Sequence, residues 1–398
     1  MMKMNIYILF TLVFITPLLS FGQSINAYLP SEANKEYAFT LNKGINKDTI
    51  QQGKISVTGN IKIKIPEKEK GYKGIGSLLI KGNNPLNLII NNENFHLEQD
   101  TTTRKYKFKE SKENDFLYSI MQDGKIPAID TTLYASHFID LIRFMQQLNR
   151  VTTQNVDLME RANARIYALD KMDMESLYTS SIWHNAIDAL TRLSVSEEAF
   201  GNDMIRLLKR IQPQEVFEHL ADNLITITEQ YGWDDAFDII VPYIKESGRI
   251  EFPQGNMYAA FALAKIQKGT LAPDIEGLET SLKSSGAPLT LLVFYQPDCE
   301  NCHIQINRLI EDYPRLKQMG VRIISISADS EKESYENDLK RFPWNKEDIL
   351  CDFEGFAGKN IITYGIMSTP TFFLIDKDDK IIKRYALLSD IRFTDVNE

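Results

Sequence analysis

Residues 291–303 read LLVFYQPDCENCH, and this stretch decides the fold of the region around it. An apolar run leads into a turn that carries two cysteines separated by two residues, and a helical pattern follows His303. A strand that feeds a helix opening with Cys-x-x-Cys is typical of a redox-active dithiol. Free backbone N–H groups at a helix N-terminus stabilise a thiolate, which favours Cys299 as the reactive thiol. Cys302 lies one helical turn further on, close enough to form a disulfide with Cys299.

The composition bounds the number of domains and the class of protein. A chain of 398 residues is long enough for two or three domains. A net charge of −9, without a stripe of Lys and Arg interleaved with aromatic residues, argues against nucleic acid as a partner. The chain has three cysteines, Cys299, Cys302 and Cys351, so it is not a scaffold stapled by disulfides. This usage suits an envelope protein whose one important disulfide is catalytic.

Residues 1–22 have the composition of a secretory signal peptide. Lys3 supplies a positive charge, residues 6–19 are apolar, and residues 20–22 (Ser-Phe-Gly) suit signal peptidase, so we expect cleavage near Gly22. The alternative is an uncleaved anchor, but the apolar run is short for a full membrane span. A lipoprotein anchor is not expected, because the segment has no cysteine. The expected location of the mature protein is the periplasm.

Three regions with different periodicities follow the signal segment. Residues 23–110 contain short alternating runs separated by Gly and Asn turns, which predicts an antiparallel β-domain. Residues 111–269 carry apolar side chains at helical spacing, which predicts an α-helical domain. Residues 270–398 alternate strand and helix patterns, which predicts an α/β domain with a central sheet. The expected breaks between the helices of the second region are Gly201, Pro213, Gly232, Gly248 and Pro253.

Residues 271–398 resemble the TlpA/ResA-like thiol–disulfide oxidoreductases, which have a thioredoxin-like fold and belong to the AhpC/TSA-type superfamily. The resemblance is carried by Ala-Pro-Asp at 272–274, by the strand leading into residues 297–302, and by Ser-Thr-Pro-Thr-Phe-Phe-Leu-Ile-Asp at 368–376. It covers about a third of the chain and implies that the protein is a thiol–disulfide oxidoreductase. The upstream β region, with Asp-Thr-Ile at 48–50 and Gly-Tyr-Lys-Gly-Ile at 71–75, resembles a β-domain of unknown function that precedes such modules.

Roles for individual residues follow from the dithiol chemistry and from the resemblance. Cys299 is expected to attack the substrate and form the mixed disulfide, and Cys302 to resolve it by closing the Cys299–Cys302 disulfide. The resemblance implies a cis peptide bond before Pro370, which would turn the Thr369 backbone toward an extended substrate segment beside the cysteines. Three neighbouring residues are expected to modulate the thiols: Asp298, Glu300 and His303.

The sequence departs from the family pattern at three positions. Asp298 stands where the family commonly has a tryptophan, and Gln305 stands where ResA-like reductases often place a glutamate. Val293 stands near the position of the buried acid of thioredoxin, so neither usual proton-relaying acid is present. The carboxylates of Asp298 and Glu300 disfavour a nearby thiolate and oppose the helix dipole. We therefore expect a reducing couple and not a strongly oxidising one.

Other chemistries use parts of the same pattern. Cys-x-x-Cys-His matches c-type haem attachment, but a haem site needs neither the strand before it nor the Thr-Pro strand after it. No Pro-x-x-x-Thr/Ser-x-x-Cys loop of the peroxiredoxin type precedes Cys299. Zinc would need a second ligand pair, and His137, His184 and His219 stand alone. Neither a metal nor a cofactor is expected, and Cys351 is expected to be a buried thiol at a strand end.

The predicted function is disulfide exchange with envelope proteins in the periplasm, in the direction of reduction. The expected partners are disulfide-containing envelope proteins and a membrane thiol electron donor that reduces the dithiol again. The alternative is a partner-binding or dimeric scaffold protein, in which the two upstream domains recognise a partner or form a homodimer and the redox module is accessory.

We predict that the protein exported by a Gram-negative host lacks residues 1–22. The intact mass of the purified periplasmic protein should correspond to a chain beginning at Gln23, because signal peptidase cleaves after the small residue Gly22. As a control, Leu9→Arg interrupts the apolar run and should leave the whole chain in the cytoplasm. An exported protein that retains the mass of residues 1–22 would contradict the prediction.

Overall fold

The computed structural model describes residues 23–124, 130–282 and 286–393. The predicted signal segment lies outside these residues. The described chain forms two compact units, the first holding residues up to Gln147 together with Asp173–Ala186, and the second holding Leu148–Met172 and the residues from Ile187 onward. Among the described helices, none combines the length and the apolar composition that a membrane span requires.

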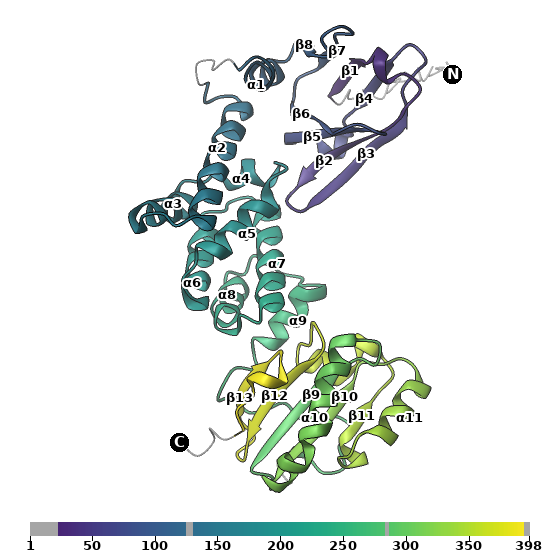
Figure 1. Cartoon of the computed structure of the whole chain (residues 1–398), viewed down its shortest axis with the longest axis vertical. Helices are drawn as coiled ribbons and strands as arrows, with labels where there is room; N and C mark the ends of the chain where they lie inside the picture. The colour runs from purple at the N-terminus through teal and green to yellow at the C-terminus, as the bar shows by residue number, and fades with distance from the viewer. Residues whose placement is uncertain (1–22, 125–129, 283–285, 394–398) are drawn as a thin grey trace, which may run out of the picture. The chain divides into compact units, whose positions relative to one another are not determined.

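The first unit contains two four-stranded sheets (Figure 1). The sheets have the strand orders β4-β1-β7-β8 and β3-β2-β5-β6. The strands are β1 (Ser24–Tyr28), β2 (Glu36–Lys43), β3 (Asn46–Lys54), β4 (Asn60–Lys64), β5 (Lys73–Ile80), β6 (Leu86–Asn91), β7 (Phe95–Gln99) and β8 (Tyr106–Lys109). In β4 the isoleucines are buried and the lysines between them are exposed, as the period of two predicts. The pairing of β1 with β7 is parallel, which alternation could not indicate because both pairing types share the same period.

The core of the first unit also includes helical residues. Side chains from both sheets share one apolar cluster with Leu117 and Tyr118 of α1 (Lys112–Asp123) and with Phe138 of α2 (Tyr134–Thr153). Ser111 caps the start of α1, because its hydroxyl accepts a hydrogen bond from the Asn114 N–H. The compact unit therefore continues beyond residue 110, where the strand pattern stops.

The predicted helical region is helical. Its other helices are α3 (Leu158–Asp170), α4 (Met174–Tyr178), α5 (Trp183–Leu193), α6 (Glu197–Leu208), α7 (Gln214–Tyr231), α8 (Asp234–Glu246) and α9 (Gly255–Leu263). Pro213, Gly232, Gly248 and Pro253 lie between helices, as expected. The prediction of a break at Gly201 is wrong, because α6 runs through it. Gly201 instead allows α6 and α8 to pack closely, because a Cβ at this position would lie 3.0 Å from the Cβ of Ile239 in α8.

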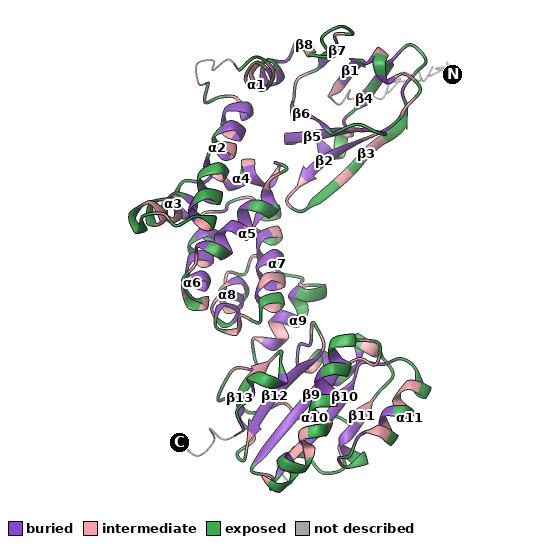
Figure 2. Ribbon diagram, in the orientation of Figure 1, coloured by how far each residue is buried: buried purple, intermediate pink, exposed green. Residues whose placement is uncertain are grey.

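The second unit also contains the predicted α/β region, with a five-stranded sheet in the order β11-β10-β9-β12-β13 (Figure 1). Its elements are β9 (Leu289–Tyr295), α10 (Glu300–Gln318), β10 (Val321–Ser327), α11 (Lys332–Arg341), β11 (Ile349–Cys351), α12 (Lys359–Thr363), β12 (Thr371–Asp376) and β13 (Ile381–Tyr385). Strands β9, β10 and β11 are parallel, whereas β12 and β13 run antiparallel to their neighbours. Every residue of the central strand β9 is buried (Figure 2), which explains the apolar run over residues 291–295. The predicted multidomain fold class is confirmed.

A buried arginine joins β13 to the helices of the same unit. Arg384 donates to Glu229 Oε2 at 2.7 Å and, through Nε at 3.0 Å, to Asp234 Oδ1. The side chains of Arg384 and Glu229 are each 13% exposed. Burial alone would lower the pKa of Arg384, but the two carboxylates outweigh it and raise the pKa, so the guanidinium stays charged. Glu229 is close to the end of α7 and Asp234 begins α8, so this cluster ties two helices to the edge strand of the sheet.

We predict that Arg384→Met destabilises the second unit by about 3 kcal/mol, because it leaves two buried carboxylates without their cation. The matched control is Arg315→Met, which removes an exposed arginine paired with Asp312 and should cost less than about 1 kcal/mol. Hydrogen exchange of the α7 and β13 amides in increasing urea measures both changes. Equal losses in the two variants would show that the buried cluster contributes no more than a surface ion pair.

Candidate dithiol site

The two cysteines of the motif lie at the start of α10. Cys299 is the residue before the first helical turn, and its Sγ accepts a hydrogen bond from the Cys302 N–H at 3.1 Å. The local sequence explains this geometry, because buried β9 ends at Tyr295 and the turn through Pro297 directs the chain into the helix. The Cys299 sulfur therefore lies at the N-terminus of α10, against a backbone N–H of the first helical turn.

The two thiols differ in exposure and in ionisation. Both cysteines are free thiols in this structure, Cys299 partly exposed and Cys302 buried, with 1% of its surface accessible. Burial, together with a hydrogen bond to Cys299, raises the pKa of Cys302 to about 12. Cys302 is therefore a thiol at neutral pH, whereas Cys299 is accessible and has its sulfur at the helix N-terminus. This difference suits a first cysteine that attacks and a second that resolves; the disulfide between them stays a prediction.

A second segment, about 70 residues further along the chain, meets the cysteines. The Thr369–Pro370 peptide bond is cis, as the resemblance implies. The Cys299 thiol donates to the Thr369 carbonyl oxygen at 3.5 Å, and the Thr369 hydroxyl donates to Gln296 Oε1 at 3.2 Å. The pairing of β12 with β9, which sets Thr371 opposite Phe294, brings this loop to the turn that carries the cysteines. The structure thus places Cys299, Cys302, Thr369 and Pro370 together.

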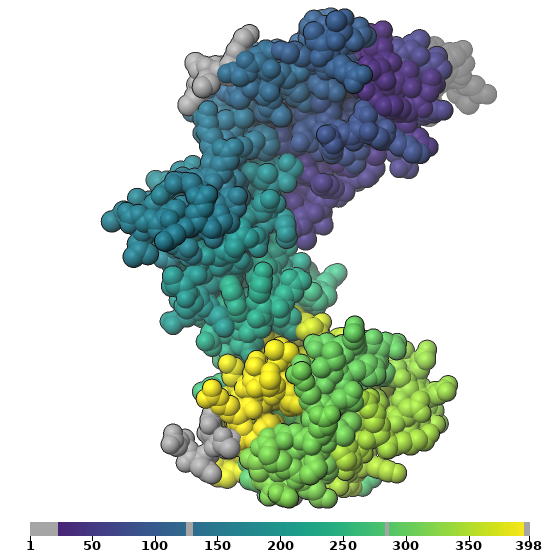
Figure 3. Space-filling model, in the orientation of Figure 1, coloured from purple at the N-terminus to yellow at the C-terminus, as the bar shows by residue number. Residues whose placement is uncertain are grey.

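The three predicted modulators lie at the periphery of the site. Asp298, Glu300 and His303 are exposed, and none of their side chains has a hydrogen bond or ion pair to either cysteine among the residues that the structure describes. The outer face of α10 is open on the surface in the space-filling view (Figure 3). Because exposed charges are screened by solvent and salt, their effect on the thiols is expected to be small.

Gln305 has a structural role that the sequence did not reveal. Its side chain is buried, with 3% of its surface accessible, and its Oε1 accepts a hydrogen bond from the Leu388 N–H at 3.0 Å. Leu388 begins a short 3-10 helix, Leu388–Asp390, that follows β13. The neutral amide therefore anchors the segment after β13 to the helix that carries the cysteines, at the position where related reductases often have an acid.

One further contact near the dithiol, between Ser368 and Glu229, could not be found from the sequence. The Ser368 hydroxyl donates to Glu229 Oε1 at 2.7 Å, so a carboxylate from the end of α7 contacts the loop before Pro370. These residues are 139 positions apart in the chain. The sequence offers no periodicity or motif that links them, and only the packing of α7 against the α/β region makes the contact.

The third cysteine lies apart from the pair. Cys351 ends β11 and is partly buried, and its thiol lies 3.6 Å from the Asp329 carbonyl oxygen. Burial raises the pKa of Cys351. Its place at a strand end agrees with the expectation, but the residue is only partly buried, and among the described residues its thiol bonds to neither Cys299 nor Cys302.

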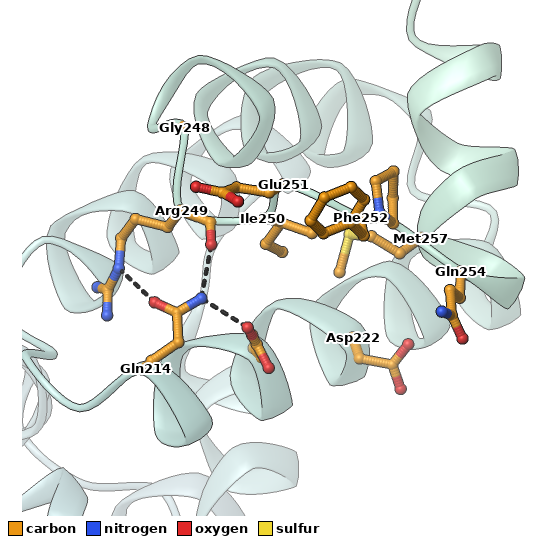
Figure 4. A pocket seen from close by; sticks show the side chains of 11 residues that line it. Gln214, Asp222, Gly248, Arg249, Ile250, Glu251, Phe252, Gln254 and Met257 are labelled. Atoms are coloured by element: carbon orange, nitrogen blue, oxygen red, sulfur yellow. Dashed lines mark hydrogen bonds between the residues drawn. The ribbon is translucent and has the colours of Figure 1, made fainter.

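A separate hollow in the helical region has no reactive group (Figure 4). It has a volume of about 710 Å³ and lies between the start of α7 and residues 248–257. Three of its polar residues bind one another: Gln214 donates to Glu218 and to the Arg249 carbonyl oxygen, each at 2.6 Å, and Arg249 Nε donates to Gln214 at 3.2 Å (Figure 4). No cysteine lines it. Among the described residues, no cluster of His, Cys, Asp and Glu suited to a metal ion is found.

We predict that iodoacetamide labels Cys299 of the reduced native protein more than about tenfold faster than Cys302, because burial and a raised pKa keep Cys302 protonated. Peptide mapping by mass spectrometry over a time course at pH ~8 measures the two rates. In the Cys299→Ser control, labelling of Cys302 should require urea. Equal labelling of both cysteines in the folded protein would contradict the assignment of their roles.

Comparisons with known proteins place residues 287–381 in a family described as thioredoxin-like. The chain is 34% identical over 124 residues to thiol-disulfide oxidoreductase ResA of Bacillus thuringiensis subsp. konkukian, and the match covers 30% of this chain and 69% of that protein. ResA of Geobacillus thermodenitrificans is 29% identical over 135 residues, which cover 32% of this chain and 75% of that protein.

Solved structures with similarity to the chain include a thioredoxin-like protein from Parabacteroides distasonis. It is 20% identical, with a TM-score of 0.27, and the match covers 30% of this chain and 87% of that chain. A thioredoxin-like protein from Bacteroides caccae is 17% identical, with a TM-score of 0.38, and the match covers 58% of this chain and 92% of that chain.

Proposed function

Because the chain belongs to the TlpA/ResA-like thiol–disulfide oxidoreductases, we propose that it reduces disulfides of envelope proteins in the periplasm. One observation carries the proposal. The Cys299 sulfur accepts the Cys302 N–H at the start of α10 and lies 3.5 Å from the carbonyl oxygen that precedes cis-Pro370. This arrangement puts an accessible sulfur, a buried second thiol and the backbone before cis-Pro370 at one place.

Disulfide exchange at this site proceeds in two steps. The Cys299 thiolate attacks one sulfur of the substrate disulfide, the substrate S–S bond breaks, and the departing sulfur takes a proton from solvent. Cys302 then attacks the Cys299 sulfur of the mixed disulfide, and its proton passes to the second departing substrate sulfur. The substrate gains two electrons and two protons, and the enzyme is left with a Cys299–Cys302 disulfide. A membrane thiol donor returns the electrons by the same exchange in reverse.

The burial of Cys302 gives the second step its selectivity. With a pKa raised to about 12, Cys302 carries little thiolate and does not itself attack substrates in solution. It reacts when the Cys299 sulfur, one helical turn away, becomes part of a mixed disulfide. The resolving thiol is thus present at high effective concentration and is still shielded from external disulfides.

Direction and location are supported by the sequence. The proposed direction keeps the sequence-based expectation that Asp298 and Glu300 disfavour a strongly oxidising couple, an effect that their exposure to solvent makes small. The signal-like residues 1–22 support export to the periplasm, where thiols oxidise unless a donor reduces them. The natural substrates in this proposal are disulfide-containing envelope proteins.

We predict that the full mature chain reduces insulin with dithiothreitol as electron donor, and that Cys299→Ser lowers the rate to the uncatalysed background. Cys351→Ser is the matched control and should keep the activity, because Cys351 lies outside the exchange site. Precipitation of the released insulin chain gives the rate. The potential of the Cys299–Cys302 couple, measured against glutathione, should lie nearer to about −270 mV than to about −120 mV.

Two results would argue against the proposal. A potential near about −120 mV would reverse the direction and make the protein an oxidant. A complete lack of Cys299-dependent turnover with any thiol donor would favour the partner-binding or dimeric scaffold.

A further inference from the structure

We propose that the end of α7 forms one wall of the substrate groove at the dithiol, and that this wall selects extended protein segments over small disulfides. The inference rests on the proposed exchange function and adds the class of substrate. The wall is the segment Glu229, Gln230, Tyr231, Gly232 and Asp234, which we call the α7 wall.

The α7 wall and the loop that carries Pro370 line the same groove, which has a volume of about 490 Å³. The rest of the lining comes from residues 368–371, residues 383–387, Asp390 and Asn301 of α10. The Thr369 carbonyl oxygen that contacts Cys299 therefore belongs to the lining loop. A substrate segment that reaches Cys299 along this loop passes beside residues of the helical region.

The α7 wall is fixed to both elements that it faces. Glu229 accepts the Ser368 hydroxyl at 2.7 Å and also binds Arg384 of β13 at 2.7 Å. Asp234 binds the same guanidinium through Nε at 3.0 Å. Because these charged groups are mostly buried and mutually paired, the groove has a defined shape before a substrate arrives, which lowers the entropy cost of binding.

The groups left open in the groove suit an extended polypeptide. Tyr231 is 56% exposed and its ring stacks on Trp233, with 5.2 Å between ring centroids, so the exposed aromatic is held in place. Leu387, which also lines the groove, is 40% exposed. Within the described part of the chain, the Thr369 N–H has no hydrogen-bond acceptor, so it is available to a substrate backbone.

These groups make two kinds of contact that a protein segment uses together. Main-chain hydrogen bonds to an exposed backbone give affinity, and apolar contacts with Tyr231 and Leu387 give specificity. The carboxylates of Glu229 and Asp234 are occupied by Arg384, and the two exposed charged residues of the lining, Lys383 and Asp390, are of opposite sign, which disfavours a site that selects one charge. A small disulfide reaches the Cys299 sulfur without contacting the α7 wall. The groove therefore selects an extended segment with an apolar side chain beside its disulfide.

The test compares one large and one small substrate in a single turnover. The reduced full chain, freed of dithiothreitol, is mixed with insulin or with hydroxyethyl disulfide, quenched with acid, alkylated and weighed by mass spectrometry. Tyr231→Ala should lower the second-order rate constant for insulin about tenfold, the effect of losing one well-placed aromatic contact. The rate constant with hydroxyethyl disulfide should change less than about twofold, which also shows that the dithiol is intact.

The matched control is Tyr258→Ala. Tyr258 is a tyrosine of α9 that is 53% exposed and does not line the groove, so both rate constants should stay unchanged. Leu387→Ala should repeat the selective loss seen with Tyr231→Ala. The inference is overturned if Tyr231→Ala behaves like Tyr258→Ala, or if it slows both substrates by the same factor. A wild-type chain that reacts with neither disulfide through Cys299 would instead overturn the proposed function, and this inference with it.

Discussion

The pairing of β12 with β9 is the constraint on which the dithiol site depends. Strand β9 is buried along its whole length and delivers the chain to Cys299, while β12 begins directly after Pro370. The antiparallel register that sets Thr371 opposite Phe294 brings the start of one strand to the end of the other. A shift by one residue would turn the alternating side chains of β12 to the opposite faces and remove the Thr369 carbonyl from Cys299. The geometry of the site is thus a consequence of core packing.

The two cysteines lie within one helical turn but differ in burial, and this difference assigns attack to Cys299 and resolution to Cys302. Cys299 precedes the first turn of α10, where the backbone N–H of Cys302 is free to bind its sulfur. Cys302 faces the apolar cluster beneath the sheet, and burial keeps it protonated. The start of α10 therefore exposes the Cys299 thiol to the substrate and shields the Cys302 thiol until a mixed disulfide has formed. Residue 305 is a glutamine and not the glutamate of the family pattern. Because Gln305 is buried, a neutral amide that accepts the Leu388 N–H avoids burying a charge near Cys302.

The helical region contributes to the α/β region through the cluster around Arg384. A buried guanidinium needs anionic partners, and β13 itself offers none at this position; α7 and α8 supply Glu229 and Asp234. Glu229 also binds Ser368 in the loop before Pro370. The Glu229 carboxylate thus takes part both in the packing of α7 against β13 and in the wall of the substrate groove. The proposed preference for extended protein segments over small disulfides therefore depends on the shape of this groove and requires no further residue in contact with the sulfur atoms.

The sequence by itself determined the fold class, the helical windows and the place of the dithiol, because these follow from local periodicity and from short motifs. The Ile and Lys alternation in β4 and the apolar run over residues 291–295 of β9 could be recognised for that reason. It could not show why Gly201 lies inside a helix, nor that Glu229 reaches Ser368, because both depend on which surfaces meet in space. The parallel pairing of β1 with β7 was hidden for the same reason. Only the tertiary structure decided the surroundings of the dithiol, since contacts between distant residues arise from packing and leave no periodic trace in the chain.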